Sequence, residues 1–319
     1  MQRRALLALP SLLAPAAHAQ AAWPTRPVRV INPYSPGGTT DVAVRLMAPR
    51  LEREFGQPFP IEARPGAGGA VGTLAAAQST DGHTLLVTNT GPLAVAPAIM
   101  ANAGYDPGRD FRFIHMFGGA PILVAVRADS PIRTLEQFVA AARARPEAVS
   151  YGNSGPGSMG HLAGLAFEQA TGTKLLHVPF RGAPEAQAGV LSGDVVAIMD
   201  TVGAHAGAVR QGTLRAIAFT AAERVPLFPE VPTLREAGMA QGVVSNWFLL
   251  CGPASLPEAT ARRIAAACRD ASREAMVRER LDGLGLVSLG EMEPEAIRAF
   301  VVAEGARWKP IVEAAGLRG

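Results

Sequence analysis

The chain has few charged side chains and no dense run of basic ones. Charged residues make up 18% of its 319 residues, and the formal net charge at pH 7 is +3. A charge this small, without clustered lysine and arginine, gives no sign of a nucleic-acid-binding surface. Hydrophobic residues make up 48%, so the chain can bury a sizeable core and is not expected to be disordered. Its length favours two domains.

The sequence also lacks the usual motifs for cofactors and metals. It has no G-x-G-x-x-G spacing after a strand and no G-K-[ST], so neither a dinucleotide nor a nucleoside triphosphate is implied, and no cofactor is expected. The six histidines are scattered, and the two cysteines lack the spacing of metal ligands, so no metal site is expected. Cys251 and Cys268 either form a disulfide, which would contribute about 3 kcal/mol on the loop-entropy model, or remain buried thiols.

No segment has the length and apolar character of a membrane-spanning helix. The N-terminus instead reads as a signal peptide covering residues 1–19, with Arg3 and Arg4 as its positive region, Ala5 to Leu13 as its apolar stretch, and Ala17-His18-Ala19 as its cleavage site. The apolar stretch is too short to span a membrane, and prolines interrupt it. We therefore expect export to the periplasm with cleavage near Ala19.

A glycine-rich turn at residues 34–41 joins an expected strand, Val28 to Ile31, to an expected helix, Asp41 to Leu51. Gly37 and Gly38 let the backbone approach a ligand closely, and Thr39 or Thr40 can act as the helix N-cap. The free N–H groups at the start of such a helix form an anion site. The alternative is that the turn only joins a strand to a helix.

A second turn of the same kind favours the ligand-binding alternative. Residues 150–158 contain three glycines and several small polar side chains, and they precede helical spacing from Met159, with Ser158 as a natural N-cap. Two such turns in different halves of the chain indicate two jaws that close on one anionic group.

Strands alternate with helices through most of the chain, which predicts parallel-dominated sheets flanked by helices. In such sheets ligands bind beyond the carboxyl ends of the strands, which is where Asn89 and Thr90 fall. The apolar runs 113–117 and 122–126 are separated by a break at Gly118-Gly119, and the alternation then restarts. Long amphipathic helices at 257–276 and 294–315 need a sheet face to cover, and the first sheet supplies it.

The predicted fold is therefore a two-domain α/β clamshell. Residues 20–122 and 221–319 form the first domain, residues 123–220 form a second domain inserted into it, and two crossing strands form the hinge.

Several segments, taken in order, resemble the Bug family, the periplasmic solute-binding proteins of tripartite tricarboxylate transporters. They are residues 30–41, 62–69, 81–86, 105–107, 154–158 with His161-Leu162, 177–182 and 229–238. The resemblance covers the whole mature chain. It implies a type II-like Venus-flytrap fold, a small carboxylate ligand (an organic acid or an amino acid), membrane transporter subunits as partners, and no catalysis; we expect a monomer.

The resemblance also implies that both turns hold the ligand carboxylate through backbone amides, hydroxyls and water. Carried over by position, the contacts are Ser35, Gly37, Gly38 and Thr39 on one jaw, and Ser154, Gly155, Gly157 and Ser158 on the other. Tyr34-Ser35-Pro36 and Phe180-Arg181 depart from the family's common residues, so the identity of the ligand does not transfer.

Each of the remaining candidate residues has two alternative roles. Asp200 either receives an ammonium or hydroxyl group of the ligand or caps a helix that starts at Thr201. Tyr34 and Phe180 either form apolar walls of the pocket or pack in the core. Arg181 either pairs with a ligand carboxylate or is a solvated loop residue. His161 either contacts the ligand or packs with its ring nitrogens satisfied.

Two other functions use the same residues. A ligand-sensing subunit for a membrane signalling partner would use the same site. A hydrolase would use Ser158 with His161, although no G-x-S-x-G elbow surrounds the serine.

Overall fold

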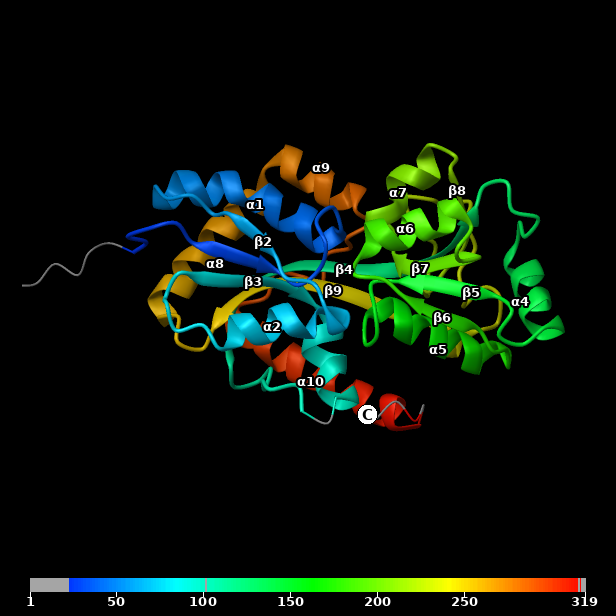
Figure 1. The fold of residues 1–319 in the computed structure, drawn as a ribbon. Helices are drawn as coiled ribbons and strands as arrows, with labels where there is room; N and C mark the ends of the chain where they lie inside the picture. The colour runs from blue at the N-terminus through cyan, green and yellow to red at the C-terminus, as the bar shows by residue number, and fades with distance from the viewer. Residues whose placement is uncertain (1–22, 101, 315, 317–319) are drawn as a thin grey trace, which may run out of the picture.

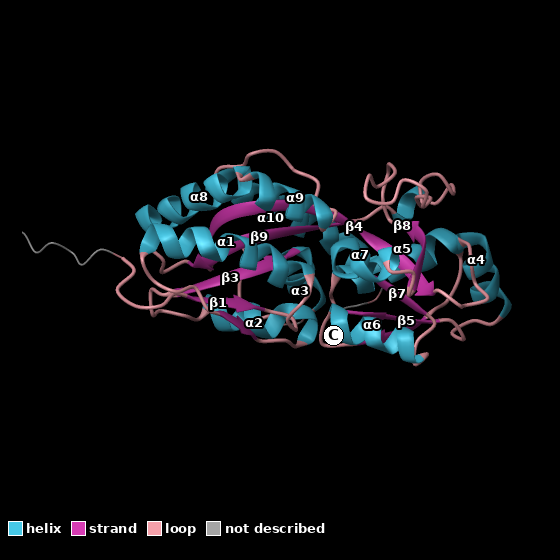
Figure 2. Cartoon of the chain, turned by 90° about the horizontal axis from the view of Figure 1, so that it is seen from above, coloured by secondary structure: helices cyan, strands magenta, loops and turns pink. Residues whose placement is uncertain are grey.

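The computed structural model describes residues 23–100, 102–314 and 316. The predicted signal peptide, residues 1–19, lies outside these. Two α/β domains lie side by side and share one long strand, β4 (Phe111–Arg127), which runs through the middle of the molecule (Figure 1). Helices cover both faces of the sheets in each domain, as the view from above also shows (Figure 2). This confirms the predicted two-domain α/β architecture.

The first domain is built from the N-terminal third of the chain and the C-terminal segment. Its elements are β1 (Arg29–Asn32), α1 (Thr39–Phe55), β2 (Ile61–Ala63), η1 (Ala67–Gly69), α2 (Ala70–Ala77), β3 (Thr84–Asn89), η2 (Gly91–Val95), α3 (Ala96–Ile99), β9 (Ser245–Pro253), α8 (Glu258–Arg273), α9 (Ala275–Gly283) and α10 (Pro294–Ala314). The strand order is β2-β1-β3-β9-β4.

The second domain repeats this plan. Its elements are α4 (Leu135–Ala144), β5 (Ser150–Asn153), α5 (Met159–Thr171), β6 (Leu176–Pro179), α6 (Ala183–Ser192), β7 (Ala197–Thr201), α7 (Val202–Arg210) and β8 (Leu214–Phe219). The strand order is β6-β5-β7-β4, with β8 on the other side of β4.

Both sheets are mixed rather than parallel-dominated. In the first domain β1 pairs parallel with β2 and β3, but β9 pairs antiparallel with β3 and β4. In the second domain β5 pairs parallel with β6 and β7, but β4 pairs antiparallel with β7 and β8. The alternation of strands and helices predicted the parallel part, while every antiparallel pair involves β4 or β9.

Strand β4 crosses from one domain to the other without a break. Up to Pro121 it pairs with β9, and from Ile122 it pairs with β7. The Gly118-Gly119 pair does not end the strand, as the sequence had predicted, but lies beside a shift in register between Met116 and Gly118. Glycine permits the φ of +133° that Gly118 adopts at this irregularity.

The return to the first domain is held to β4 by Thr220. Its hydroxyl accepts from Ile122 N at 2.9 Å and donates to Val244 O at 2.8 Å. The intervening chain stays beside the second domain, because Leu234 N donates to Phe219 O at 2.9 Å and the short turn η3 (Ala240–Gly242) packs against α5. We therefore propose that the second crossing lies near Ser245 rather than at residues 220 and 221.

The two faces of the sheets bury separate apolar cores that run through both domains. One core contains residues of α1, α8, α6 and α7, and the other contains residues of α2, α10, α4 and α5. Cys251 of β9 belongs to the second core and Cys268 of α8 to the first, so the sheet separates them. Both are free buried thiols, which decides the question that the sequence had left open.

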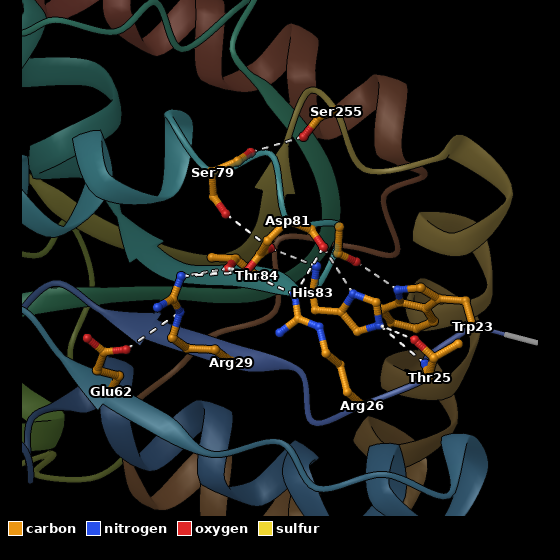
Figure 3. A network of polar contacts seen from close by, with 11 residues as sticks. Trp23, Thr25, Arg26, Arg29, Glu62, Ser79, Asp81, His83, Thr84 and Ser255 are labelled. Atoms are coloured by element: carbon orange, nitrogen blue, oxygen red, sulfur yellow. Dashed lines mark hydrogen bonds and ion pairs between the residues drawn. The ribbon is translucent and has the colours of Figure 1, made fainter.

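A polar network fixes the start of the described chain to the first domain (Figure 3). Trp23 Nε1 donates to Gly82 O at 2.8 Å, and the Asp81 carboxylate lies 3.6 Å from Arg26 and 3.7 Å from Arg29. The network surrounds the beginnings of the parallel strands β1 and β3. Their carboxyl ends, and the two glycine-rich turns, therefore lie at the opposite edge.

In the part of the chain that the structure describes, no helix combines the length and apolar character needed to cross a membrane.

Candidate functional site

A cavity lies between the domains where the two glycine-rich turns face each other. Residues of both domains line it: Tyr34, Gly38, Thr39, Thr40, Asn89, Asn246 and Phe248 from the first, and Ser154, Ser158, Met159, Ala183, Asp200, Thr201 and Ala204 from the second. Seven of the thirteen predicted ligand contacts are among them: Tyr34, Gly38, Thr39, Asn89, Ser154, Ser158 and Asp200. The structure therefore brings the two predicted jaws together.

The other six predicted contacts lie around this cavity with different partners. Gly37 N donates to the Asp41 carboxylate, Thr90 Oγ1 accepts from Trp247 N, and Gly155 N donates to Asn153 Oδ1. Gly157 N donates to His161, and the Ser35 hydroxyl donates to Glu185. The Phe180 ring packs so closely against Gly152 and Gly189 that a Cβ on either glycine would lie less than 3 Å from it.

The start of α1 offers backbone donors to the cavity. Its N-cap is Gly38, not Thr39 or Thr40 as the sequence had predicted, and no side chain caps the helix. The first N–H groups of a helix have no intrahelical acceptor, and the helix dipole adds positive character there. Thr39 Oγ1 is also buried without a hydrogen-bond partner. This helix terminus is a suitable site for an anion.

An acidic residue lies just behind this site, and an arginine neutralises it. Asp41 is buried in the first turn of α1, where its carboxylate accepts from Gly37 N at 3.0 Å and from Arg45 Nε at 2.9 Å. Its carboxylate therefore stabilises the turn from within the domain rather than occupying the cavity side.

Tyr34 and Asn89 form a rigid polar wall of the cavity. The Tyr34 hydroxyl lies 2.9 Å from Gly68 O and 3.0 Å from Asn89 Oδ1, and it can donate to either. Burial raises the pKa of Tyr34, so its hydroxyl remains a donor. The ring thus has both roles that the sequence had left open, since it is buried and it lines the cavity.

Asp200 faces Tyr34 and its neighbours from the end of β7. Its carboxylate accepts from Ser154 Oγ at 2.6 Å and from Thr201 N at 2.7 Å. Burial raises the pKa of Asp200, while these hydrogen bonds act in the opposite direction. The N-cap of α7 is Thr201, so Asp200 is not the helix cap, and the residue lines the cavity.

The second turn is held by hydrogen bonds within its own domain. Ser158 is the N-cap of α5, as predicted, and its hydroxyl accepts from His161 N at 3.3 Å. Asn153 Oδ1 accepts from Gly155 N at 2.9 Å, from Ser158 Oγ at 3.3 Å and from His177 Nε2 at 3.1 Å. One buried amide oxygen therefore fixes both ends of the turn.

Two stacked imidazoles support this turn from behind. The rings of His161 and His177 lie 4.2 Å apart at an angle of 12°, and His161 Nδ1 accepts from Gly157 N at 3.2 Å. Burial lowers the pKa of His161 to about 4 and that of His177 to about 3, so both are neutral at physiological pH. His161 thus packs with a ring nitrogen satisfied.

This arrangement gives no support to the hydrolase alternative. The Ser158 hydroxyl is engaged by Asn153 and by the backbone of His161, while the imidazole accepts from Gly157 and stacks on His177. A serine nucleophile requires hydrogen bonding to the imidazole of a base. In the described ranges, no group of three or more His, Cys, Asp or Glu is arranged to hold a metal ion.

The domains touch each other at two further places, so the cleft is closed. Ser35 Oγ donates to Glu185 Oε1 of α6 at 2.5 Å. Gly68 lies so close to the second turn that a Cβ on it would be 1.9 Å from Pro156 O. The cavity between these contacts has a volume of about 30 Å³.

The sequence did not identify several residues of the cavity wall. Thr201 follows Asp200 at the end of a parallel strand, so the strand-end rule could have found it. Asn246 and Phe248 gave no such signal, because β9 is antiparallel and brings its beginning, not its end, to this edge. Asn246 Nδ2 donates to Thr201 Oγ1 at 2.9 Å, and its Oδ1 is buried without a partner.

The chain matches the family model described as the tripartite tricarboxylate transporter family receptor over residues 43–317. Protein BugT of Bordetella pertussis is 32% identical over 298 residues, which cover 93% of this chain and 91% of that protein. The solved structure of the periplasmic binding protein BugD superposes with a TM-score of 0.88 at 28% identity, covering 93% of this chain and 99% of that one.

MatC from Rhodopseudomonas palustris, solved with bound malate, superposes with a TM-score of 0.86 at 30% identity, covering 91% of this chain and all of that one. The uncapped helix, the interdomain cavity and these matches agree with the resemblance drawn from the sequence. The chain belongs to the tripartite tricarboxylate transporter receptor family, also called the Bug family, of periplasmic solute-binding proteins.

Proposed function

We propose that this protein is a receptor for a small carboxylate, which it binds between its domains and delivers to the membrane subunits of a tripartite tricarboxylate-type transporter. The observation that carries the proposal is the N-terminus of α1, which no side chain caps and which opens into a cavity lined by both domains. The solved relative with bound malate is in accord with a carboxylate ligand.

In this proposal the ligand binds first to the turn at Gly38 and Thr39. Ser154, Ser158 and Asp200 reach it only when the second domain closes, so the ligand favours the closed form. Asp200, which lines the cavity from β7, receives a hydroxyl or ammonium group if the ligand carries one. The closed shape is what the membrane partner recognises.

The test is a thermal-shift screen of the mature protein against small mono-, di- and tricarboxylates and amino acids. A ligand at about 100 times its dissociation constant adds about 2.7 kcal/mol of stability, which raises the melting temperature measurably. A shift with one class of acid supports the proposal. A Gly38→Val variant should lose the shift, because its side chain projects where the backbone meets the ligand.

The backbone at Gly38 has room for a Cβ. Its φ is −76°, and a Cβ would have only Ser35 O near it, at 4.0 Å. Gly207→Val is the matched control, because Gly207 is on the exposed side of α7 with open space around it. Retention of the ligand-induced shift in Gly38→Val would overturn the assignment of this turn.

We also propose that the N-terminal segment directs export and is removed after Ala19. The sequence pattern of residues 1–19 supports this, and the network around Trp23 holds the chain shortly after the expected cleavage point. N-terminal sequencing of the protein purified from a periplasmic fraction should begin at Gln20. A first residue upstream of this would contradict the assignment.

A further inference from the structure

Two polar side-chain atoms in the wall of the cavity are buried and have no hydrogen-bond partner among the described residues. They are Thr39 Oγ1, at the start of α1, and Asn246 Oδ1, at the start of β9. Thr39 is only 4% exposed and Asn246 only 3%. A buried polar group without a partner destabilises the structure, so each atom marks a place where a bound molecule can supply the missing partner.

The two atoms need different partners. A threonine hydroxyl can donate or accept, so Thr39 can donate to a carboxylate bound at the N-terminus of α1. An amide oxygen can only accept, and an ionised carboxylate has no proton to donate to it. A carboxylate alone would therefore leave Asn246 Oδ1 unsatisfied.

The Asn246 amide is held in place from two sides. Its backbone pairs with Ala120 of β4, just before that strand enters the second domain at Ile122. Its Nδ2 donates to Thr201 Oγ1 of the second domain at 2.9 Å. The amide thus spans the two domains, and the oxygen is the end that remains unpaired when the cleft is closed.

The other acceptor in this part of the wall, Asp200, already has donors from the protein. One oxygen of its carboxylate accepts from Ser154 Oγ at 2.6 Å, and the other accepts from Thr201 N at 2.7 Å. Thr201 therefore joins the two acceptors, because its backbone binds Asp200 and its hydroxyl binds Asn246. The acceptor that still lacks a donor is Asn246.

The size of the cavity determines where that donor can come from. The cavity has a volume of about 30 Å³. A buried water needs roughly 10–15 Å³ of such space, so the cavity holds about two or three waters. A carboxylate group fills most of this space and leaves little room for a bridging water. The donor must then belong to the ligand itself, next to its carboxylate.

We infer that Asn246 determines specificity by accepting a hydrogen bond from a hydroxyl or ammonium group on the carbon next to the ligand's carboxylate. Acids without such a group bind less tightly, because they leave the amide oxygen unsatisfied in the closed form. This inference rests on the proposed function, because it assigns to one residue of the same cleft a role in selecting the ligand.

The experiment compares acids that differ only in the substituent on this carbon. Lactate and alanine are titrated against propionate, and malate and aspartate against succinate, by calorimetry. The wild-type protein should bind at least one substituted acid about 10-fold or more tightly than its unsubstituted counterpart. Asn246→Leu removes the acceptor at similar size and should reduce this preference to about 2-fold or less. The hydroxy and amino acids together show which donor the amide accepts.

Thr201→Val is the matched control, because it breaks the same hydrogen bond between the domains but leaves Asn246 Oδ1 in place. Thr201 is the N-cap of α7 but makes no side-chain capping hydrogen bond, so valine removes no cap. Both variants should bind every acid less tightly through poorer closure, but only Asn246→Leu should lose the preference. Asn246→Asp, which keeps an acceptor, should retain it.

Equal binding of substituted and unsubstituted acids by the wild-type protein would overturn the inference. An unchanged preference in Asn246→Leu would overturn it too, and so would a preference lost equally in Thr201→Val. Asn246→Ala removes the same oxygen and replaces Asn246→Leu if that variant does not fold.

These results do not decide the proposed function, which stands if any carboxylate gives a thermal shift that Gly38→Val abolishes. Binding of none of the six acids would overturn the inference, and the broader thermal-shift panel would then decide the proposed function separately.

Discussion

The turn between β1 and α1 leaves the first N–H groups of its helix without a side-chain cap, whereas the turn between β5 and α5 caps its helix with Ser158. The two turns occupy corresponding places in the two domains, because β1 and β5 are each flanked by two parallel strands in the orders β2-β1-β3 and β6-β5-β7. The same strand-turn-helix arrangement therefore leaves the N-terminus of α1 open to an anion, whereas a side chain of its own turn caps the N-terminus of α5.

A buried asparagine at the end of the strand organises each turn. Asn32 Oδ1 accepts from Tyr34 N at 3.4 Å and from Thr40 Oγ1 at 2.9 Å. Asn153 Oδ1 accepts from three donors, including His177. The first turn can serve as an anion site because none of its side chains binds the first N–H groups of the helix. In the second turn the Ser158 side chain binds one of these groups, and the turn is fixed within its own domain.

The largest expected effect comes from separating the two turns. Gly68→Ala places a Cβ against Pro156 O across the cleft, so the domains cannot close fully. We expect the affinity for the acid found in the screen to fall about 100-fold, or about 2.8 kcal/mol. Small-angle X-ray scattering should show a more open molecule in the presence of that acid.

Gly82→Ala is the control for this variant. Gly82 has a φ of 65°, close to the 60° of Gly68, but a Cβ there would meet nothing within 4 Å. In both variants an alanine must adopt a positive φ, at about the same cost in free energy, so the variants differ only in the contact across the cleft. Equal affinities in the two variants would show that this contact does not limit closure.

A smaller effect should distinguish the two asparagines. Asn153→Ala leaves three donors without their acceptor, two in the second turn and one on His177 of β6, whereas Asn32→Ala leaves two, one of them in a long contact. An unsatisfied buried group costs about 1–3 kcal/mol, so the free energy of unfolding should fall by more in Asn153→Ala, by roughly 1 kcal/mol. Urea denaturation of both variants measures this. An equal loss would mean that the extra donor, His177, contributes nothing.

Acid should weaken the second turn through its histidines. The pKa of His161 is lowered to about 4 and that of His177 to about 3, against about 6.5 in the unfolded chain. The unfolded state therefore binds more protons between pH 6.5 and about 4. The free energy of unfolding is therefore unaffected by these two histidines above pH 6.5. Below that pH it falls by up to about 1.4 kcal/mol per pH unit for each histidine.

The double variant His161→Asn, His177→Gln tests this. Asparagine keeps an acceptor near Nδ1 and glutamine keeps a donor near Nε2, but neither titrates. Its unfolding free energy should depend less on pH than that of the wild type between pH 6.5 and 4. His115 and His205, whose pKa values burial also lowers, are present in both proteins and cancel. Parallel pH profiles would refute the assignment.

The smallest effect concerns the contact between the first turn and α6. Ser35→Ala and Glu185→Gln each weaken one interdomain hydrogen bond, which is worth about 1 kcal/mol, so each should lower ligand affinity roughly fivefold. The double variant should lose little more than either single one. Additive losses in this double-mutant cycle would show that the two side chains act independently.

Local sequence patterns predicted most of the elements. Apolar strands followed by small polar turns and helical spacing placed the starts of α1 and α5 within two residues of their observed positions, and Ser158 was correctly identified as the cap of α5. These features depend on residues a few positions apart. The cap of α1 was misassigned because a glycine N-cap leaves no side-chain signal, and threonines at the next positions were the more usual choice.

Features that join distant segments could be predicted only in part. Gly118-Gly119 reads as a break in the sequence, yet β4 continues through it because β9 and the second-domain strands supply partners on both sides. Cys251 and Cys268 remain thiols because they lie on opposite faces of the sheet, which the sequence does not show. Asn246 entered the cavity wall because β9 runs antiparallel, a fact that no local pattern contains.

By itself, the sequence determined the α/β class, the two glycine-rich turns and the family, because these follow from short-range spacing and from the order of segments along the chain. Only the tertiary structure decided which face of the closed cleft each side chain occupies. Asp200 meets Ser154 because β7 and β5 are neighbours in the second sheet. Ser35 meets Glu185, 150 positions away, because the two domains approach each other.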